Sequence, residues 1–157
     1  ELIEGEVVPM SPIGREHAAC ARRSDVLFSR RFEGRVQVSV QNPIRLEDSE
    51  PQPDIALLRP REDFYASGHP TPKDIFLVVE VSDTTLEYDR DVKARLYAAA
   101  GVPETWIANL TGGGLLVCRA PGAAGYRDVK TFRQGERGSP EAFPEEEFGV
   151  EEVLGKA

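Results

Sequence analysis

The segment FLVVEVSDTT, residues 76–85, constrains the fold more than any other part of the chain. Its run of apolar residues predicts a strand over about residues 74–82. Alternation along that strand places Phe76, Val78 and Glu80 on one face, and the first two make this face too hydrophobic to be simply solvated. A lone ionised carboxylate buried there carries a large desolvation cost. Glu80 therefore needs a neighbouring cation, a proton or an exit into a cleft.

Periodicity and turn residues predict further elements on both sides of this strand. The expected elements are a short strand or hairpin around Gly5, a helix over 15–31, strands within 35–46 and 51–60, a loop over 60–73, a helix over 84–101 that begins at Thr84 or Thr85 and ends at Gly101, and strands over 103–110 and 114–120. Glycines 112–114 predict a hairpin turn between the last two strands.

This order of elements predicts an α/β (α+β) fold with a central mixed sheet flanked by helices. We expect one domain over residues 1–157, with its core at about 15–110. Residues 111–157 are expected to form a C-terminal hairpin and an acidic, mostly irregular tail. Four apolar side chains of that tail are expected to pack at the edges of the core: Phe143, Phe148, Val150 and Leu154.

The charge of the chain is unevenly distributed. The formal net charge is −8, and residues 141–152 carry six acids and no base. Residues 15–45 carry seven arginines against three acids. Such an arginine-rich face could contact the phosphates of a nucleic acid, or it could be an ordinary solvated helix surface.

Other global features favour a cytoplasmic protein. No apolar run approaches the roughly 18 residues of a membrane helix, and the first residues have neither the basic start nor the apolar stretch of a secretion signal. Cys20 and Cys118 lack metal-ligand spacing, so we interpret them as reduced thiols of the core.

A second acidic residue stands beside an apolar strand. Asp54 directly precedes the apolar residues 55–58 and lies 26 positions before Glu80. If the two strands pair antiparallel, both carboxylates reach the same end of the sheet. A shared divalent cation would then make Glu80 tolerable, because magnesium prefers carboxylate oxygens and water.

The helix that follows supplies a lysine. Asp89, Lys93 and Tyr97 recur at intervals of four and therefore share one helix face. Lys93 is either half of an ordinary Asp–Lys helix pair or a cation that reaches the two carboxylates. In the second case it could orient a water and stabilise negative charge on a phosphate.

Two segments of the chain resemble a known family. The segments PQPDIALL and LVVEVSDTTLEYDRDVKARLYAAAGVPETWI are similar to the Uma-two family of restriction endonucleases, a branch of the PD-(D/E)XK nuclease superfamily. ELIEGEVVPMSP and REHAAC extend the resemblance to about residues 1–110. It implies a restriction-endonuclease-like fold and cleavage of DNA that depends on Mg²⁺, with Mn²⁺ as an alternative. It also implies an active site of Asp54, Glu80 and a lysine, with the two carboxylates as metal ligands. The superfamily's usual lysine position holds Ser82, so the resemblance assigns the lysine role to Lys93.

Several further residues are candidates for supporting roles. His17 could approach the metal or the DNA, or it could make a local hydrogen bond at the start of its helix. Ser82 could contact the site or cap the following helix, and we expect the cap. Asp89 accompanies Lys93 on its helix face, and Gln52 could contact the substrate. Glu4 or Glu6 could support the site, or the pair could mark a wet strand face.

Three hypotheses of function follow. The leading one is a metal-dependent DNA endonuclease that hydrolyses phosphodiester bonds, as a homodimer by analogy with enzymes that cut both strands. The second is a nuclease-like fold without cleavage that binds DNA or another protein. The third is a structural domain in which the three charged residues form a buried ion-pair network.

Overall fold

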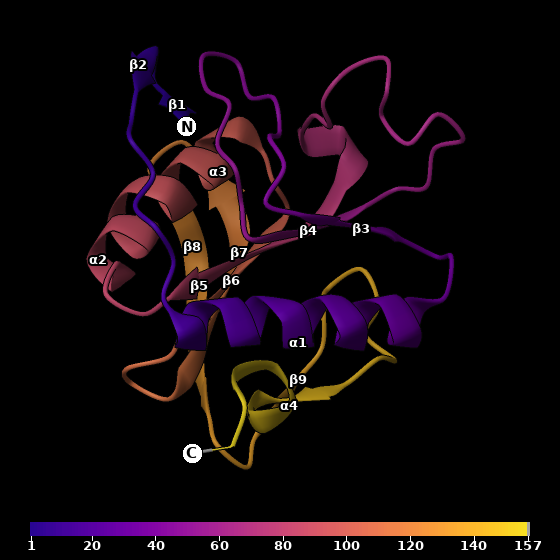
Figure 1. Cartoon of the computed structure of the whole chain (residues 1–157), viewed down its shortest axis with the longest axis vertical. Helices are drawn as coiled ribbons and strands as arrows, with labels where there is room; N and C mark the ends of the chain where they lie inside the picture. The colour runs from indigo at the N-terminus through magenta and orange to yellow at the C-terminus, as the bar shows by residue number, and fades with distance from the viewer. Residues whose placement is uncertain (157) are drawn as a thin grey trace.

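A six-stranded mixed sheet forms the centre of the computed structural model, which describes residues 1–156 (Figure 1). The strand order is β3-β4-β5-β6-β7-β8, and every neighbouring pair is antiparallel except β5 and β6. The strands are β3 (Gln37–Val40), β4 (Ile55–Leu58), β5 (Ile75–Ser82), β6 (Glu104–Asn109), β7 (Gly114–Gly122) and β8 (Gly125–Arg133). This architecture confirms the predicted central mixed sheet.

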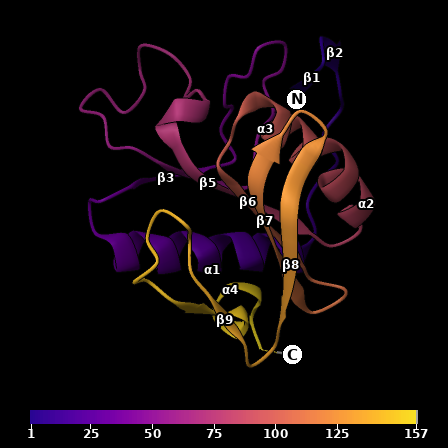
Figure 2. The same cartoon turned by 180° about the vertical axis from the view of Figure 1, so that it is seen from behind.

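Helices cover both faces of the sheet. The α-helices are α1 (Arg15–Phe32), α2 (Leu86–Tyr88), α3 (Ala94–Ala100) and α4 (Val150–Leu154). A five-residue π-helical turn, η2 (Asp89–Lys93), joins α2 to α3, and a short 3₁₀ helix, η1 (Pro72–Asp74), leads into β5. Two small two-stranded sheets complete the fold: β1 (Leu2–Ile3) with β2 (Glu6–Val7), and β9 (Arg137–Gly138) with β10 (Phe148–Gly149). In Figures 1 and 2, α1 lies along one face of the sheet and α2–α3 along the other.

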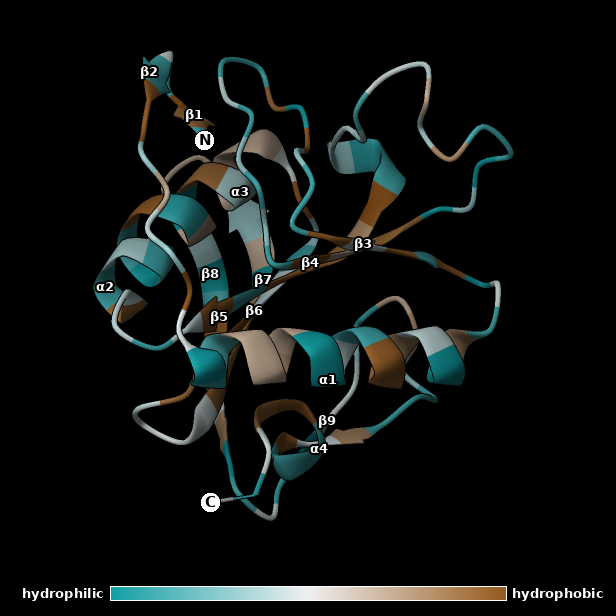
Figure 3. Cartoon of the chain, in the orientation of Figure 1, coloured by the Kyte–Doolittle hydropathy of each residue, from teal (hydrophilic) through white to brown (hydrophobic). Residues whose placement is uncertain are grey.

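Two hydrophobic clusters follow from this layering. Leu77 and Val79 of β5 pack with α1 residues such as Phe28, whereas Val78 of the same strand packs with Tyr97 of α3. The strand is therefore buried on both faces, as its apolar run predicted. Figure 3 shows the hydrophobic residues of the central strands between the two helical layers.

One detail of the predicted alternation is wrong. The pairing of β4 with β5 shifts register between Leu57 and Leu58, so Phe76 is an extra residue in β5. Phe76 packs against the cluster on the α1 side, with its ring 5.0 Å from that of Phe143, and does not share a face with Val78. A bulge of this kind leaves no signal in the alternation of a uniformly apolar strand.

The C-terminal third is more ordered than the sequence indicated. The predicted hairpin between β6 and β7 is confirmed, but the sheet continues into β8, which was expected to be irregular. Most residues of β8 are exposed, so this edge strand lacks the apolar alternation by which strands are recognised. Phe148, Val150 and Val153 are fully buried in the α1-side cluster, which therefore extends well beyond residue 110.

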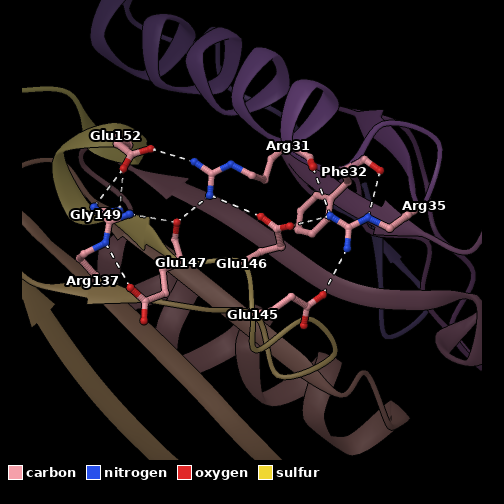
Figure 4. Close-up of polar contacts among 9 residues, drawn as sticks. All are labelled: Arg31, Phe32, Arg35, Arg137, Glu145, Glu146, Glu147, Gly149 and Glu152. Atoms are coloured by element: carbon pink, nitrogen blue, oxygen red, sulfur yellow. Dashed lines mark hydrogen bonds and ion pairs between the residues drawn. The ribbon is translucent and has the colours of Figure 1, made fainter.

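The acidic segment of the tail is attached to the arginines of α1 by ion pairs. Arg35 contacts Glu145 and Glu146, and Arg31 contacts Glu146 and Glu152 (Figure 4). We call this set, together with Arg137 and Glu147, the acidic belt. Part of the arginine-rich face therefore binds the protein's own carboxylates.

The two cysteines and the lengths of the helices also bear on predictions from the sequence. Cys20 and Cys118 are both buried and free, as predicted. Among residues 1–156, no helix combines the length and the apolar character that crossing a bilayer requires.

Candidate active site

Asp54 and Glu80 meet where β4 begins and β5 approaches its end. The antiparallel pairing places Ile55 opposite Val79, so the two acidic residues are brought together as the sequence predicted. The backbone N–H of Asp54 donates to Oε1 of Glu80 at 2.9 Å, and the N–H of Val81 donates to Oδ2 of Asp54 at 2.8 Å. Each carboxylate thus accepts a backbone N–H from the segment that carries the other.

Lys93 reaches this pair from the helical side. Its Nζ lies 2.5 Å from Oε2 of Glu80 and 2.6 Å from Oε1 of Glu1, and the lysine is only 5% exposed. Asp89 and Tyr97 are also buried, in agreement with the predicted shared helix face. Lys93 ends the π-helical turn η2, and such widened turns occur frequently at functional sites.

The buried charges shift one another's pKa values. Burial raises the pKa of Glu80 to about 8; Lys93 opposes this rise, whereas Asp54 reinforces it. Burial lowers the pKa of Lys93, but the charges of Glu80 and Glu1 outweigh it and leave that pKa well above its usual value. The lysine therefore stays an ammonium, while Glu80 still binds its proton more readily than a solvated carboxyl, so a further positive charge nearby would favour its ionised form.

His17, in the first turn of α1, contacts the other carboxylate. Its Nε2 lies 3.2 Å from Oδ2 of Asp54, and this hydrogen bond raises the pKa of His17 against the opposing effect of burial. Among residues 1–156, hydrogen bonds to the Asp54 carboxylate reach Oδ2, from His17 and Val81, and none reaches Oδ1. One oxygen of Asp54 is therefore anchored and the other is available to a ligand.

Ser82 and Asp89 form a separate hydrogen-bonded group beside the lysine. The hydroxyls of Ser82 and Thr85 both donate to Oδ2 of Asp89, at 2.6 and 2.7 Å. The expectation that Ser82 caps the helix is wrong, because Ser82 is the last residue of β5 and the helix begins after Thr85. Burial raises the pKa of Asp89, while the hydroxyl of Ser82 lowers it.

Asp54, Glu80 and Lys93 line one cleft of about 370 Å³. Its charged lining comprises Glu1, His17, Asp54, Glu80, Asp83, Asp89 and Lys93. Gln52 also lines the cleft, and its backbone N–H donates to Oε1 of Glu1 at 2.8 Å. The N-terminal segment 8–14, which leads into α1, forms one wall.

The available donors suit a cation that keeps most of its water ligands, as magnesium does, and do not suit a metal held by protein ligands alone. Among residues 1–156, no group of three or more histidine, cysteine or acidic side chains is arranged to hold a metal. Magnesium needs fewer protein ligands, because it binds one or two carboxylates and keeps several waters. Asp54 and Glu80 supply two hard oxygen donors in a cleft where acids outnumber bases.

Comparison with known proteins places the chain in a family. Residues 1–151 match the model of the Uma2 family, described as "Putative restriction endonuclease". The chain belongs to the Uma2 family. This is the family that the segments around Asp54, Glu80 and Lys93 resemble.

Solved structures show that the Uma2 chain shares its fold with a known protein. It is similar to the crystal structure of "a putative nuclease belonging to DUF820" from Anabaena variabilis, with a TM-score of 0.73 and 13% sequence identity. The match covers 98% of this chain and 88% of that one. At this identity the likeness concerns the fold alone. A search of curated proteins finds no match.

Sequence reasoning missed one residue of this Uma2 site. It weighed Glu4 and Glu6 as supporting acids, but both are exposed on the N-terminal hairpin. Glu1 instead reaches Lys93, 92 positions further along the chain. A contact between residues so far apart has no local pattern that could have revealed it.

Proposed function

We propose that this Uma2 protein is a metal-dependent DNA endonuclease that hydrolyses phosphodiester bonds. The observation that carries the proposal is the convergence of Asp54, Glu80 and Lys93 in one cleft. Two carboxylates from adjacent strands and a buried ammonium group suit an attack of water on a phosphate. The family description supports a nuclease, and DNA and Mg²⁺ are the substrate and cofactor that we infer.

Asp54 and Glu80 would hold the cation, with Mg²⁺ preferred and Mn²⁺ as an alternative. A bound divalent cation supplies Lewis acidity toward a phosphate oxygen and lowers the pKa of a water. The protein contributes the positions of the ligands, since strand N–H groups and His17 fix both carboxylates.

Lys93 is assigned the role of the lysine that nuclease sites of this kind require. Its ammonium contacts the Glu80 carboxylate directly, although the position two residues after Glu80 holds Ser82. From there it can donate hydrogen bonds to the attacking water or to a phosphate oxygen, which gains negative charge in the transition state. Ser82 instead binds Asp89, on the same helix as the lysine.

The test is nicking of supercoiled plasmid DNA in the presence of Mg²⁺ or Mn²⁺. Asp54→Asn, Glu80→Gln and Lys93→Met are each expected to lower the rate by about 100-fold or more, the size of effect seen when one transition-state stabilising group is removed. The belt variant Glu147→Gln removes one negative charge away from the cleft, as Asp54→Asn and Glu80→Gln do within it, and it should cut like wild type. Equal trace cleavage by wild type and the three site variants would defeat the proposal. A parallel RNA substrate tests the choice of nucleic acid.

The proposal extends to a homodimer, because a duplex cut requires two hydrolytic events. Light scattering on the purified protein, with and without DNA, tests this part separately. A monomer that only nicks duplex DNA would remove the dimer from the proposal and leave the endonuclease in place.

A further inference from the structure

Glu1 makes two buried contacts that the proposed function leaves unexplained. Its Oε1 lies 2.6 Å from Nζ of Lys93 and accepts the backbone N–H of Gln52 at 2.8 Å. The side chain of Glu1 is only 8% exposed. One carboxylate oxygen therefore joins the N-terminal segment to the helix that carries the lysine and to the loop that leads into Asp54.

The arrangement distinguishes the role of Glu1 from that of Glu80. Lys93 lies between these two carboxylates, and the proposed function assigns Glu80 to the metal as well. Glu80 is also tied to Asp54, whose N–H it accepts at 2.9 Å, whereas the contacts of Glu1 are to Lys93 and to the Gln52 N–H. Of the two carboxylates that contact Lys93, Glu1 is therefore the one that the proposed function does not also assign to the metal.

We propose that Glu1 is a positioning residue for Lys93. Its carboxylate holds the ammonium in place over the end of β5 and sets its position relative to the segment that carries Asp54, through the Gln52 N–H. Glu1 does not touch the reacting atoms. The catalytic consequence rests on the proposed nuclease activity, whereas the placement of the lysine does not.

The placement of Lys93 by Glu1 can be tested without metal or DNA. Reductive methylation followed by peptide mass spectrometry measures how protected each lysine is, with the exposed Lys73 and Lys130 as internal references. Lys93 should be strongly protected in wild type and should lose that protection in Glu1→Ala. The matched control is Glu6→Ala, which removes an exposed carboxylate from the same hairpin and should leave Lys93 protected. Persistent protection of Lys93 in a folded Glu1→Ala protein would overturn the proposal.

The catalytic consequence is tested by kinetics. Glu1→Ala should lower kcat by about 10- to 100-fold, the cost of a misplaced catalytic group, and leave the Mg²⁺ concentration for half-maximal rate unchanged. Glu1→Gln preserves the side-chain shape and an acceptor oxygen and should recover part of the rate. A large rise in the Mg²⁺ requirement would instead identify Glu1 as a metal ligand and overturn the proposal.

Methylation of Lys93 and the rate of DNA cleavage report on different things: the first on the role of Glu1, the second on the nuclease activity. If wild type does not cleave DNA, the endonuclease proposal fails and methylation alone decides the role of Glu1. If Glu1→Ala does not fold, the amide variant Glu1→Gln replaces it, and unchanged protection and kcat in that variant count against a role for the charge.

Discussion

The protein contains two clusters of charged side chains that differ in burial and in balance. In the acidic belt, Arg31, Arg35 and Arg137 face glutamates of the C-terminal tail, and most of these side chains are substantially exposed. In the cleft, Lys93 contacts the carboxylates of Glu1 and Glu80, and His17 contacts that of Asp54. The carboxylate of Asp89 also lines this cleft, and Glu80 is 2% exposed.

This difference indicates which cluster would gain from a bound cation. Exposed ion pairs are screened by water and contribute little, so the belt is complete without a further partner. Buried carboxylates in excess are costly, because low-dielectric surroundings do not solvate their charge. We therefore expect the cleft to gain from an added cation and the belt not to.

The largest expected contrast comes from removing one cation from each cluster. Lys93→Met leaves the two buried carboxylates of Glu1 and Glu80 without a cationic partner and should lower the free energy of unfolding by about 3–5 kcal/mol. Arg137→Met in the belt should cost less than about 1 kcal/mol. Urea unfolding in the absence of metal measures both. Adding Glu80→Gln to Lys93→Met should recover part of the loss, and similar losses in the two clusters would remove the distinction.

A divalent cation is expected to stabilise the cleft and leave the belt unaffected. Mg²⁺ at 100 times its dissociation constant should raise the free energy of unfolding by about 2.7 kcal/mol if it binds one site of the native state. Thermal denaturation with increasing Mg²⁺ measures this. Glu80→Gln should abolish the rise, and Glu147→Gln should retain it. A rise that persists in Glu80→Gln would place the cation elsewhere.

The pH dependence of stability should also separate the clusters. The pKa values of Glu80 and His17 are both raised in the folded protein, to about 8 for Glu80. A group with a raised pKa binds its proton more tightly when folded, so its contribution to stability is lost as pH rises. Without metal, the free energy of unfolding should fall between about pH 5 and pH 8, by on the order of 1–3 kcal/mol.

Denaturant unfolding across this pH range measures the slope. Glu80→Gln should flatten most of it, leaving the smaller part due to His17, while Glu146→Gln in the belt should not change it. A wild-type stability that rises from pH 5 to pH 8 would show that Glu80 is ionised at little cost.

The smallest expected effect lies within the belt. Glu146→Gln removes a carboxylate that contacts both Arg31 and Arg35, and it should cost under about 1 kcal/mol in dilute buffer. The loss should shrink further in 1 M NaCl, because salt screens exposed pairs. Unfolding at two salt concentrations provides the measurement. A loss that is large and insensitive to salt would show that the belt behaves like a buried cluster.

Local pattern determined much of the fold and of the candidate site. The apolar run of β5, the short strand β4 and the periodicity of the helix after β5 are each encoded over a few residues, since they follow from burial on particular faces. Asp54, Glu80 and Lys93 stood out because they interrupt or border those patterns. The polar edge strand β8 and the bulge at Phe76 escaped because neither changes the local apolar pattern.

The tertiary structure alone decided which charges meet. The pairing of His17 with Asp54, of Glu1 with Lys93 and of the acidic tail with α1 joins segments separated by tens of residues. Such contacts depend on the packed sheet and helices, because a side chain can find a distant partner only after both backbones are in place. The sequence by itself predicted the strand that buries Glu80 and the approach of Asp54 and Lys93 to it; only the folded chain decided that Glu1 pairs with Lys93 and His17 with Asp54.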